Sequence, residues 1–132
     1  MITEDYVSFE TAKLLKEKGF NVYVRSYYEK DVYRTKEEFS TNNALWNWNI
    51  SNFRYSAPTL QMAMKWLREV HNVFIDISSR FSKNADSDVC FSYSCKKLID
   101  TYKSSYEIGD GEWLNYEEAC EAAIKYCLEN LI

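Results

Sequence analysis

The chain has few of the residues that build flexible or phosphate-binding loops. Its 132 residues include three glycines and one proline. A glycine-rich phosphate cradle needs several closely spaced glycines, and neither a P-loop pattern nor G-x-G-x-x-G occurs. No Pro- or Gly-rich linker divides the sequence, so we expect a single domain over residues 1–132. That length allows one core to bury roughly two thirds of the surface of the unfolded chain.

Histidine occurs once, which limits the catalytic chemistry. Any mechanism that uses an imidazole must use His71, which closes an expected helix beside Asn72. A histidine there can bond the last carbonyls and meet the negative end of the helix dipole, so we favour a structural role. A Cys–His nucleophilic pair is the alternative, but no local signature favours it, and no H-E-x-x-H motif or nucleophile elbow occurs. We therefore expect a protein that is not an enzyme.

Long apolar runs are also absent. No uninterrupted run approaches the ~20 residues that a membrane-spanning helix needs. Residues 1–5 lack the positive and apolar regions of a secretion signal. We therefore expect a cytoplasmic protein with no membrane partner, in which the four cysteines are thiols.

The spacing of the cysteines does not favour a metal site. Cys90 and Cys95 lie five residues apart, and Cys120 and Cys127 lie seven apart. Neither pair has the tight two-residue gap of structural zinc hairpins. Cys120 and Cys127 fall on the apolar arc of an expected helix, where a free cysteine packs as a small hydrophobe. We expect core packing for these residues, and neither a metal nor another cofactor.

Excess positive charge is absent too. The formal net charge is −4, and residues 1–111 hold 15 basic and 15 acidic side chains, so the imbalance lies in residues 112–132. A broad basic face that binds double-stranded nucleic acid through counterion release is therefore not expected. A protein that mimics DNA is also disfavoured, because the acidic residues do not cover a whole surface.

Three segments have the signals of helices. Residues 8–19 begin with Ser8 as a candidate N-cap and end at Gly19. Residues 56–71 have a proline in the first turn and apolar residues at i, i+3, i+4 and i+7. Residues 115–132 open with a capping-box pattern and place their acids opposite an apolar arc.

Between these helices the apolar period changes to two, which predicts strands. We expect them over residues 20–28, 73–78 and 89–95, and further strands around 44–50 and 98–108. Polar stretches at 28–43 and 78–88 indicate hairpin loops. The order α-β-β-α-β-β-(β)-α predicts an α+β fold, in which one antiparallel sheet of about four to six strands has three helices packed on one side.

The chain is rich in aromatic residues between the first two helices. Ten of the 36 residues from 20 to 55 are aromatic, interleaved with three arginines. Alternation on a strand would turn Trp46 and Trp48 to the same face, and the simpler interpretation is that both fill the core. The other is that one of them stacks on a flat ligand, while arginine counters phosphate and asparagine amides bind polar edges. The candidate ligand-binding residues are Arg25, Tyr27, Trp46, Trp48, Arg54 and Tyr55.

The start of the second helix adds to this expectation. It follows the aromatic segment directly, so an anion held there would meet the exposed amides of its first turn.

The three helical segments together resemble a family of small phage and prophage proteins of gut Bacteroidales, a family with no established activity. The resembling stretches are VSFETAKLLKEKGF, SAPTLQMAMKWLREVHN and YEEACEAAIKYCLENLI, about a third of the chain. The resemblance implies a phage accessory protein that acts in the cytoplasm of an infected bacterium, and it carries no catalytic residues.

Small phage proteins of this kind are often antagonists of host immunity, and two mechanisms are open. In the first, the protein is a sponge that sequesters a nucleotide-derived immune signal; arginines among aromatic residues favour this. In the second, it is an inhibitor that docks on a host defence protein; the acidic arc of the last helix favours that. By analogy with other sequestering proteins, we also expect a homodimer or a higher homo-oligomer.

Overall fold

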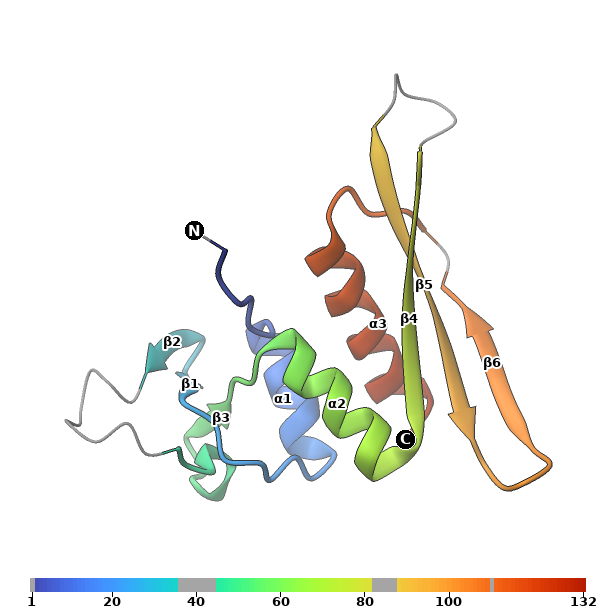
Figure 1. The fold of residues 1–132 in the computed structure, drawn as a ribbon. Helices are drawn as coiled ribbons and strands as arrows, with labels where there is room; N and C mark the ends of the chain where they lie inside the picture. The colour runs from blue at the N-terminus through green and yellow to red at the C-terminus, as the bar shows by residue number, and fades with distance from the viewer. Residues whose placement is uncertain (1, 36–44, 82–87, 110) are drawn as a thin grey trace. The chain divides into compact units, whose positions relative to one another are not determined.

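A computed structural model describes residues 2–35, 45–81, 88–109 and 111–132 (Figure 1). The described chain has an α+β fold with three α-helices and two antiparallel sheets of three strands each. Its residues divide into two compact units, Met1–Ala63 and Met64–Ile132, which we call the N-terminal and the C-terminal unit. Each unit contains one sheet. That the chain is a single domain stays a prediction.

Helix α1 (Phe9–Glu17) begins and ends at the predicted signals. The hydroxyl of Ser8 caps it by accepting a hydrogen bond from the amide of Thr11 at 3.2 Å. At the other end Gly19 has a φ of 88°, and the amide of Phe20 bonds the carbonyl five residues earlier at 2.9 Å. Glycine is favoured there because a left-handed residue lets the chain turn back onto the last carbonyls.

The sheet of the N-terminal unit consists of short strands in the order β2-β1-β3. They are β1 (Ser26–Glu29), β2 (Val32–Thr35) and β3 (Arg54–Ser56). Lys30 and Asp31, with φ of 54° and 74°, form the two-residue turn between β1 and β2. Positive φ at both positions matches the twist of the paired strands.

Strand β2 shows that the predicted loop at 28–43 is wrong for residues 32–35. The turn before it is Lys-Asp, which lacks the Asn-Gly or Asp-Gly signal by which such hairpins are recognised. The rest of that predicted loop, residues 36–44, lies outside the described residues.

The predicted strand around 44–50 is also wrong. Trp46 makes one isolated bridge with Val24, through backbone bonds of 2.9 and 3.0 Å. The chain then forms a 3₁₀ turn, η2 (Trp48–Ile50). Asn47 starts this turn by accepting the amide of Asn49 at 3.1 Å on its side-chain oxygen. An asparagine that bonds the backbone two residues later favours a turn over a ladder.

The predicted strand over 20–28 is shorter in the structure, because regular pairing begins only at Ser26. The chain bends at Arg25. The bend breaks the alternation, so that Ser26 and Tyr27 are both buried although they are adjacent. Strict alternation predicts that Tyr27 points outward with Arg25. In the structure Tyr27 points into the core instead.

The strands form two sheets, which corrects the prediction of one. The described strands of each unit pair among themselves. The physical reason is that chain neighbours pair most readily: β1 with β2, and β4 (Val73–Phe81) with β5 (Val89–Leu98). Strand β3 has only three residues, and only three more separate its end from the start of a helix, so it offers little edge for extending its sheet.

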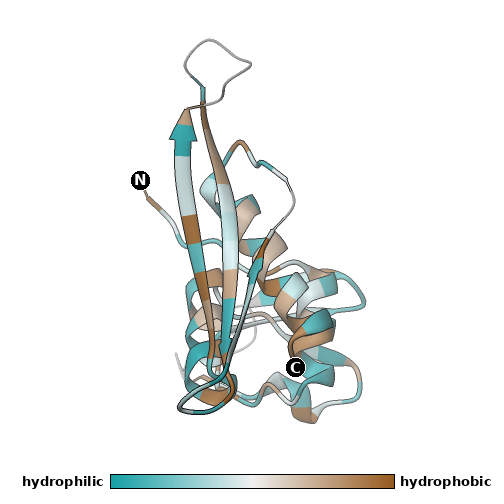
Figure 2. Ribbon diagram, turned by 90° about the vertical axis from the view of Figure 1, so that its right-hand side faces the viewer, coloured by the Kyte–Doolittle hydropathy of each residue, from teal (hydrophilic) through white to brown (hydrophobic). Residues whose placement is uncertain are grey.

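The C-terminal unit has the longer strands, in the order β4-β5-β6 with β6 at Ser104–Ile108. Apolar and polar bands follow one another along the two long strands (Figure 2), and residues 73–78 of β4 alternate between more buried and exposed. Helix α3 (Tyr116–Asn130) packs against β4 and β5. Its N-cap is Asn115, as predicted, whose side chain accepts the amide of Glu118 at 2.7 Å.

The predicted strands at 73–78 and 89–95 are confirmed and extend further, to residues 81 and 98. The predicted strand around 98–108 is confirmed for residues 104–108. The loop predicted at 78–88 is wrong for residues 78–81, which belong to β4, and its residues 82–87 lie outside the described ranges.

Helix α2 (Leu60–His71) crosses the boundary between the units. It starts after Thr59, whose hydroxyl accepts the amide of Met62 at 3.1 Å. Its last residue, His71, lies edge-on to Trp66 with ring centroids 4.6 Å apart. Within the described chain, no helix is long and apolar enough to cross a membrane.

Candidate ligand-binding site

The six predicted ligand-binding residues all lie in the N-terminal unit, but they do not form one surface. Tyr27 and Trp48 are core residues. Arg25 lines a small hollow, and Tyr55 lines a second, larger hollow. Trp46 contacts Tyr23 of the small hollow, and Arg54 lies over the two core rings.

Tyr27 and Trp48 form the core of this region. They are 1% and 8% exposed, and their rings pack together with centroids 4.2 Å apart and planes tilted by 34°. The indole N–H of Trp48 donates to the carbonyl of Val24 at 3.1 Å, which satisfies its polar atom. A flat ligand has no free ring face to stack on at either residue. The burial of Trp48 agrees with the interpretation of this residue as core.

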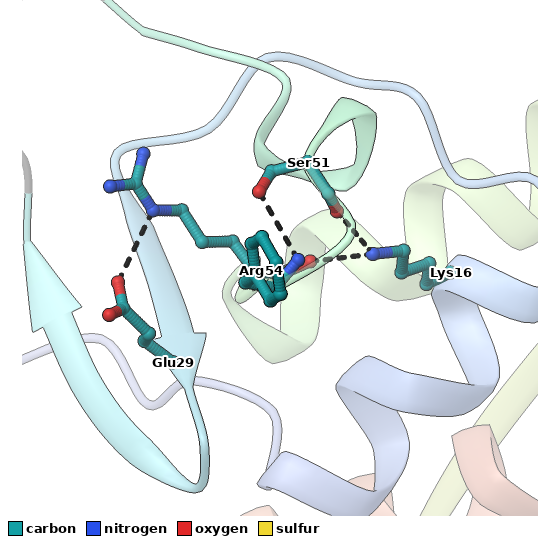
Figure 3. A network of polar contacts seen from close by, with 5 residues as sticks. Lys16, Glu29, Ser51 and Arg54 are labelled. Atoms are coloured by element: carbon teal, nitrogen blue, oxygen red, sulfur yellow. Dashed lines mark hydrogen bonds and ion pairs between the residues drawn. The ribbon is translucent and has the colours of Figure 1, made fainter.

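Arg54 covers this buried pair. Its guanidinium lies 5.1 Å from the centroid of Tyr27 and 5.5 Å from that of Trp48. Its Nε also pairs with a carboxylate oxygen of Glu29 at 3.3 Å (Figure 3). The guanidinium is therefore held by two aromatic faces and one carboxylate, with its side chain 41% exposed.

Lys16 anchors the loop before β3 to α1. Its Nζ donates to the carbonyls of Ser51 and Arg54 at 2.6 and 2.9 Å. In Figure 3 Lys16 lies on one side of Arg54, and Glu29 lies on the other. The same ammonium lies 4.7 Å from the centroid of Tyr55. Desolvation by its surroundings lowers the pKa of Lys16 from its ordinary value. Carbonyl dipoles and the ring face nevertheless give the charge a favourable environment.

The larger hollow, which we call the Tyr55 hollow, has a volume of about 440 Å³. Its walls are aromatic: the rings of Phe9 and Tyr55 meet at 89° with centroids 5.4 Å apart, and Phe53 is 75% exposed. Polar groups come from the β1–β2 turn and from the loop before β3. The lining residues are Phe9, Glu29, Lys30, Asn52, Phe53 and Tyr55.

The loop that presents Phe53 is held in place by hydrogen bonds. The hydroxyl of Ser51 accepts the amide of Phe53 at 3.2 Å, and the carbonyl of the same serine accepts the Lys16 ammonium. A side chain that bonds the backbone two residues later stabilises a turn. The exposed ring of Phe53 therefore projects from an ordered turn that is tied to α1.

Cationic side chains gather around the Tyr55 hollow. Lys30 is part of the lining, and Lys13 lies 5.0 Å from the centroid of the Phe9 ring. Lys16 lies over the ring of Tyr55, and Arg54 pairs with Glu29, both of which are residues of the lining. The acid of the lining, Glu29, is engaged by Arg54, so the hollow combines stacking surface with positive charge.

The smaller hollow, which we call the Arg25 hollow, has a volume of about 140 Å³. A cavity of ~150 Å³ holds one benzene ring, so this hollow accepts one small ring and no more. Trp46 is 48% exposed, and its ring centroid lies 6.2 Å from that of Tyr23, a residue of the lining. The lining residues are Tyr6, Tyr23, Val24, Arg25, Leu45, Ala57, Pro58, Thr59 and Met62.

The anion site expected at the start of α2 is not supported by the amides found there. The amide of Leu60 donates to the carbonyl of Asp5 at 2.9 Å, and the amide of Met62 donates to the hydroxyl of Thr59. Both groups are already engaged within the protein. An anion would have to displace these bonds to reach them.

Sequence reasoning missed Phe9, Lys16, Lys30 and Phe53. Phe9 and Lys16 are seven residues apart in α1, which places them on one helix face, but nothing in the sequence indicates that this face meets the aromatic segment. Phe53 follows Ser51, a turn-forming residue, and that pattern could have suggested an outward-facing ring.

The described residues contain no group of three or more His, Cys, Asp and Glu side chains placed to hold a metal ion. Comparison of the chain with protein-family models, with curated proteins and with solved structures finds no match. The resemblance to phage proteins therefore stays a prediction.

Proposed function

We propose that this protein is a non-enzymatic phage accessory protein that sequesters a small nucleotide-derived ligand, such as a host immune signal, in the Tyr55 hollow. The observation that carries the proposal is an aromatic hollow of about 440 Å³ with cationic side chains around it. Small-molecule sites typically have volumes of roughly 300–1,000 Å³, with apolar walls and a few polar groups. The phage origin and the cytoplasmic action rest on the resemblance of the helices alone.

A base of the ligand stacks on Phe53 in this proposal. Every nucleobase has a flat face, and stacking on an aromatic side chain contributes about 1–3 kcal/mol per base. Phe53 is 75% exposed, so its ring offers a face without any rearrangement of the core. Asn52, which neighbours it in the lining, supplies an amide for the polar edge of the base.

The phosphate of the ligand lies near Lys30. This lysine belongs to the two-residue β1–β2 turn and lines the hollow. Lys13 of α1 lies over the ring of Phe9, another residue of the lining. The positive charge of these two lysines favours an anion in the hollow, and the interaction weakens as salt screens it.

Thermal shift with purified protein tests the proposal. We expect one member of a panel of cyclic oligonucleotides and ADP-ribose derivatives to raise the melting temperature, because a ligand that binds only the folded state stabilises it. Mass spectrometry should then recover that ligand unchanged, which distinguishes sequestration from turnover. A panel without any shift would contradict the proposal, and a chemically altered ligand would contradict the absence of enzymatic activity.

The substitution Phe53→Ala locates the site. We expect the dissociation constant to rise about 5- to 150-fold, the equivalent of about 1–3 kcal/mol of lost stacking, with little change in melting temperature. Tyr102→Ala is the matched control, because Tyr102 is a 95% exposed aromatic residue of the C-terminal unit. Equal affinities of the wild type and Phe53→Ala, measured by calorimetry, would place the ligand elsewhere.

The second candidate function is inhibition of a host defence protein. The observation that favours it is the Arg25 hollow with its exposed rim, where Tyr23, Leu45 and Trp46 are 57%, 50% and 48% exposed. Aromatic side chains around a small pocket are typical of residues that dominate protein interfaces. Co-purification of a host protein that is lost in Trp46→Ala, without a shift by any nucleotide, would favour this candidate.

Self-association belongs to the same proposal and rests on analogy. If a ligand extends beyond the Tyr55 hollow, a second copy can enclose the remainder. Light scattering after gel filtration, with and without the ligand identified by thermal shift, measures the oligomeric state. A monomer under both conditions would remove self-association from the proposal without affecting ligand binding.

A further inference from the structure

Two cysteines meet inside the C-terminal unit. Cys95 lies on β5 and Cys127 on α3, and their Sγ atoms are 3.1 Å apart. Both side chains are buried, at 1% and 0% exposed. A disulfide bond is about 2.05 Å long, so the sulfurs need to approach by only about 1 Å to form one.

Contacts on either side keep these two sulfurs together. Two residues before Cys95, the ring of Tyr93 lies 6.1 Å from that of Tyr126. Two residues after it, the ammonium of Lys97 donates to the carbonyl of Leu131 at 2.5 Å. Residues spaced by two share one face of a strand. Three successive positions on the same face of β5 therefore contact α3 or its C-cap residue Leu131, with the cysteine pair in the middle.

The hydrogen bond between the two thiols shifts their pKa values in opposite directions. Cys127 donates its S–H to the sulfur of Cys95. This bond lowers the pKa of Cys95, although its burial opposes the effect. The same bond and desolvation raise the pKa of Cys127. Because the thiolate is the nucleophile in thiol chemistry, Cys95 is the sulfur that attacks first.

We propose that Cys95 and Cys127 form a reversible disulfide that cross-links β5 to α3 when the protein meets a hydroperoxide. The Cys95 thiolate attacks the O–O bond of hydrogen peroxide, giving a sulfenic acid and hydroxide. Cys127 then attacks the sulfenic sulfur, so that the S–S bond forms and the S–O bond breaks. The protons of the two thiols leave in water, and one peroxide yields one disulfide and two water molecules.

Burial determines which oxidants can act. Hydrogen peroxide is small and uncharged, so it can reach the pair during local opening of the C-terminal unit, whereas bulky oxidants cannot. The other two cysteines lack this arrangement. Cys120 is buried, and desolvation raises its pKa to about 11, so it stays a poorly reactive thiol. Cys90 is also buried, at 1% exposed.

The disulfide changes the stability of the C-terminal unit. It closes a loop from β5 through β6 to the last turns of α3, and cross-linking positions 32 residues apart restricts the unfolded chain. The oxidised protein therefore melts at a higher temperature than the reduced protein. Dithiothreitol reverses the difference.

The experiment treats the full chain with hydrogen peroxide, denatures it, and alkylates the remaining thiols. We expect two alkylated cysteines instead of four, an intact mass lower by two hydrogen atoms before alkylation, and one cross-linked peptide joining the segments around 95 and 127. The variant Cys90→Ala/Cys120→Ala keeps the pair and should give the same cross-link. The variant Cys127→Ser should give none, and a dimedone adduct on Cys95 instead.

Two results would overturn the proposal. One is four alkylated cysteines after peroxide treatment at a urea concentration below the unfolding transition, where local opening is frequent. The other is a cross-linked peptide that contains Cys90 or Cys120. Because the Cys90→Ala/Cys120→Ala variant leaves the proposed pair intact, the outcome does not depend on whether Cys127→Ser folds.

Discussion

The two units differ in what holds their backbones. In the C-terminal unit long antiparallel ladders join strands of nine and ten residues, and α3 covers them with small buried residues such as Ala119 and Ala123. The strands of the N-terminal unit have three or four residues. Side chains there replace the missing ladder: Asn49 donates to the carbonyl of Phe20 and accepts the amide of Ser56, both at 2.8 Å.

The difference explains where binding features occur. An irregular backbone held by side chains presents rings and cations at varied angles, as at Phe53 and Lys30, while a regular ladder directs side chains to two fixed faces. In the C-terminal unit the two cysteines that we propose are oxidised, Cys95 and Cys127, are buried where β5 meets α3. We therefore expect recognition in the N-terminal unit and oxidation chemistry in the C-terminal unit.

The largest effect is expected for Trp48→Ala in the N-terminal unit. Trp48 packs against Tyr27, lies under Arg54, and donates its indole N–H to the carbonyl of Val24. Truncation of a buried tryptophan typically costs about 3–5 kcal/mol. Urea unfolding followed by circular dichroism measures this change.

Trp46→Ala is the matched control for this prediction, because the two residues are two positions apart and Trp46 is 48% exposed. We expect it to cost about 1 kcal/mol, as half of the ring is already in water. Equal losses in the two variants would mean that both rings fill the core, and the contrast between a buried and an exposed tryptophan would then be wrong.

Periodicity predicted the C-terminal unit well for a physical reason. Its strands are long enough for several cycles of alternation, so the pattern of apolar residues alone identifies residues 73–78 and 89–95 as strands. The capping residue Asn115 also marks the start of α3 without reference to distant contacts. The sequence could not reveal that Cys95 and Cys127 touch, because that contact depends on how helix and sheet are aligned.

The N-terminal unit was harder to predict because its decisive interactions are not periodic. The 3₁₀ turn at 48–50 depends on one asparagine side chain, and the bend at Arg25 moves Tyr27 from the expected outer face into the core. The candidate site depends on Lys16 of α1 reaching the backbone of Ser51 and Arg54, which are 35 and 38 residues away. Local sequence patterns cannot predict a contact between residues so far apart in the chain.

A second prediction compares one glycine from each unit. An added Cβ at Gly109 would overlap the ring of Tyr93, which is 7% exposed and has the ring of Trp113 against it, with centroids 5.3 Å apart. We expect Gly109→Ala to cost about 3 kcal/mol, at the upper end of overpacking effects. At Gly19 nothing lies within 4 Å, and the φ of 88° alone strains an alanine, so Gly19→Ala should cost about 1 kcal/mol.

Thermal unfolding of both glycine variants checks this difference, and a third variant identifies its cause. In Gly109→Ala/Tyr93→Leu the ring is gone, so the added methyl group should cost less than it does beside tyrosine. If Gly109→Ala lowers the free energy of unfolding as much beside leucine as beside tyrosine, the cause is the backbone at residue 109 and not the ring of Tyr93.

The smallest effect concerns two arginine–glutamate pairs of similar exposure. Arg54 pairs with Glu29 in the N-terminal unit, and Arg80 pairs with Glu112 in the C-terminal unit; the arginines are 41% and 45% exposed. Half-exposed pairs contribute about 0.2–1 kcal/mol, which is the loss expected for Arg80→Ala. Arg54→Ala should cost about 1–2 kcal/mol, because the guanidinium also covers the rings of Tyr27 and Trp48.

Salt separates the two contributions. At 1 M NaCl the Debye length is about 3 Å, so the loss from Arg80→Ala should nearly vanish. Contact with aromatic faces is screened less where the rings are buried, so most of the loss from Arg54→Ala should remain. If the loss from Arg54→Ala disappears with salt, the arginine acts only as a surface charge. Its contact with the rings of Tyr27 and Trp48 would then contribute nothing to stability.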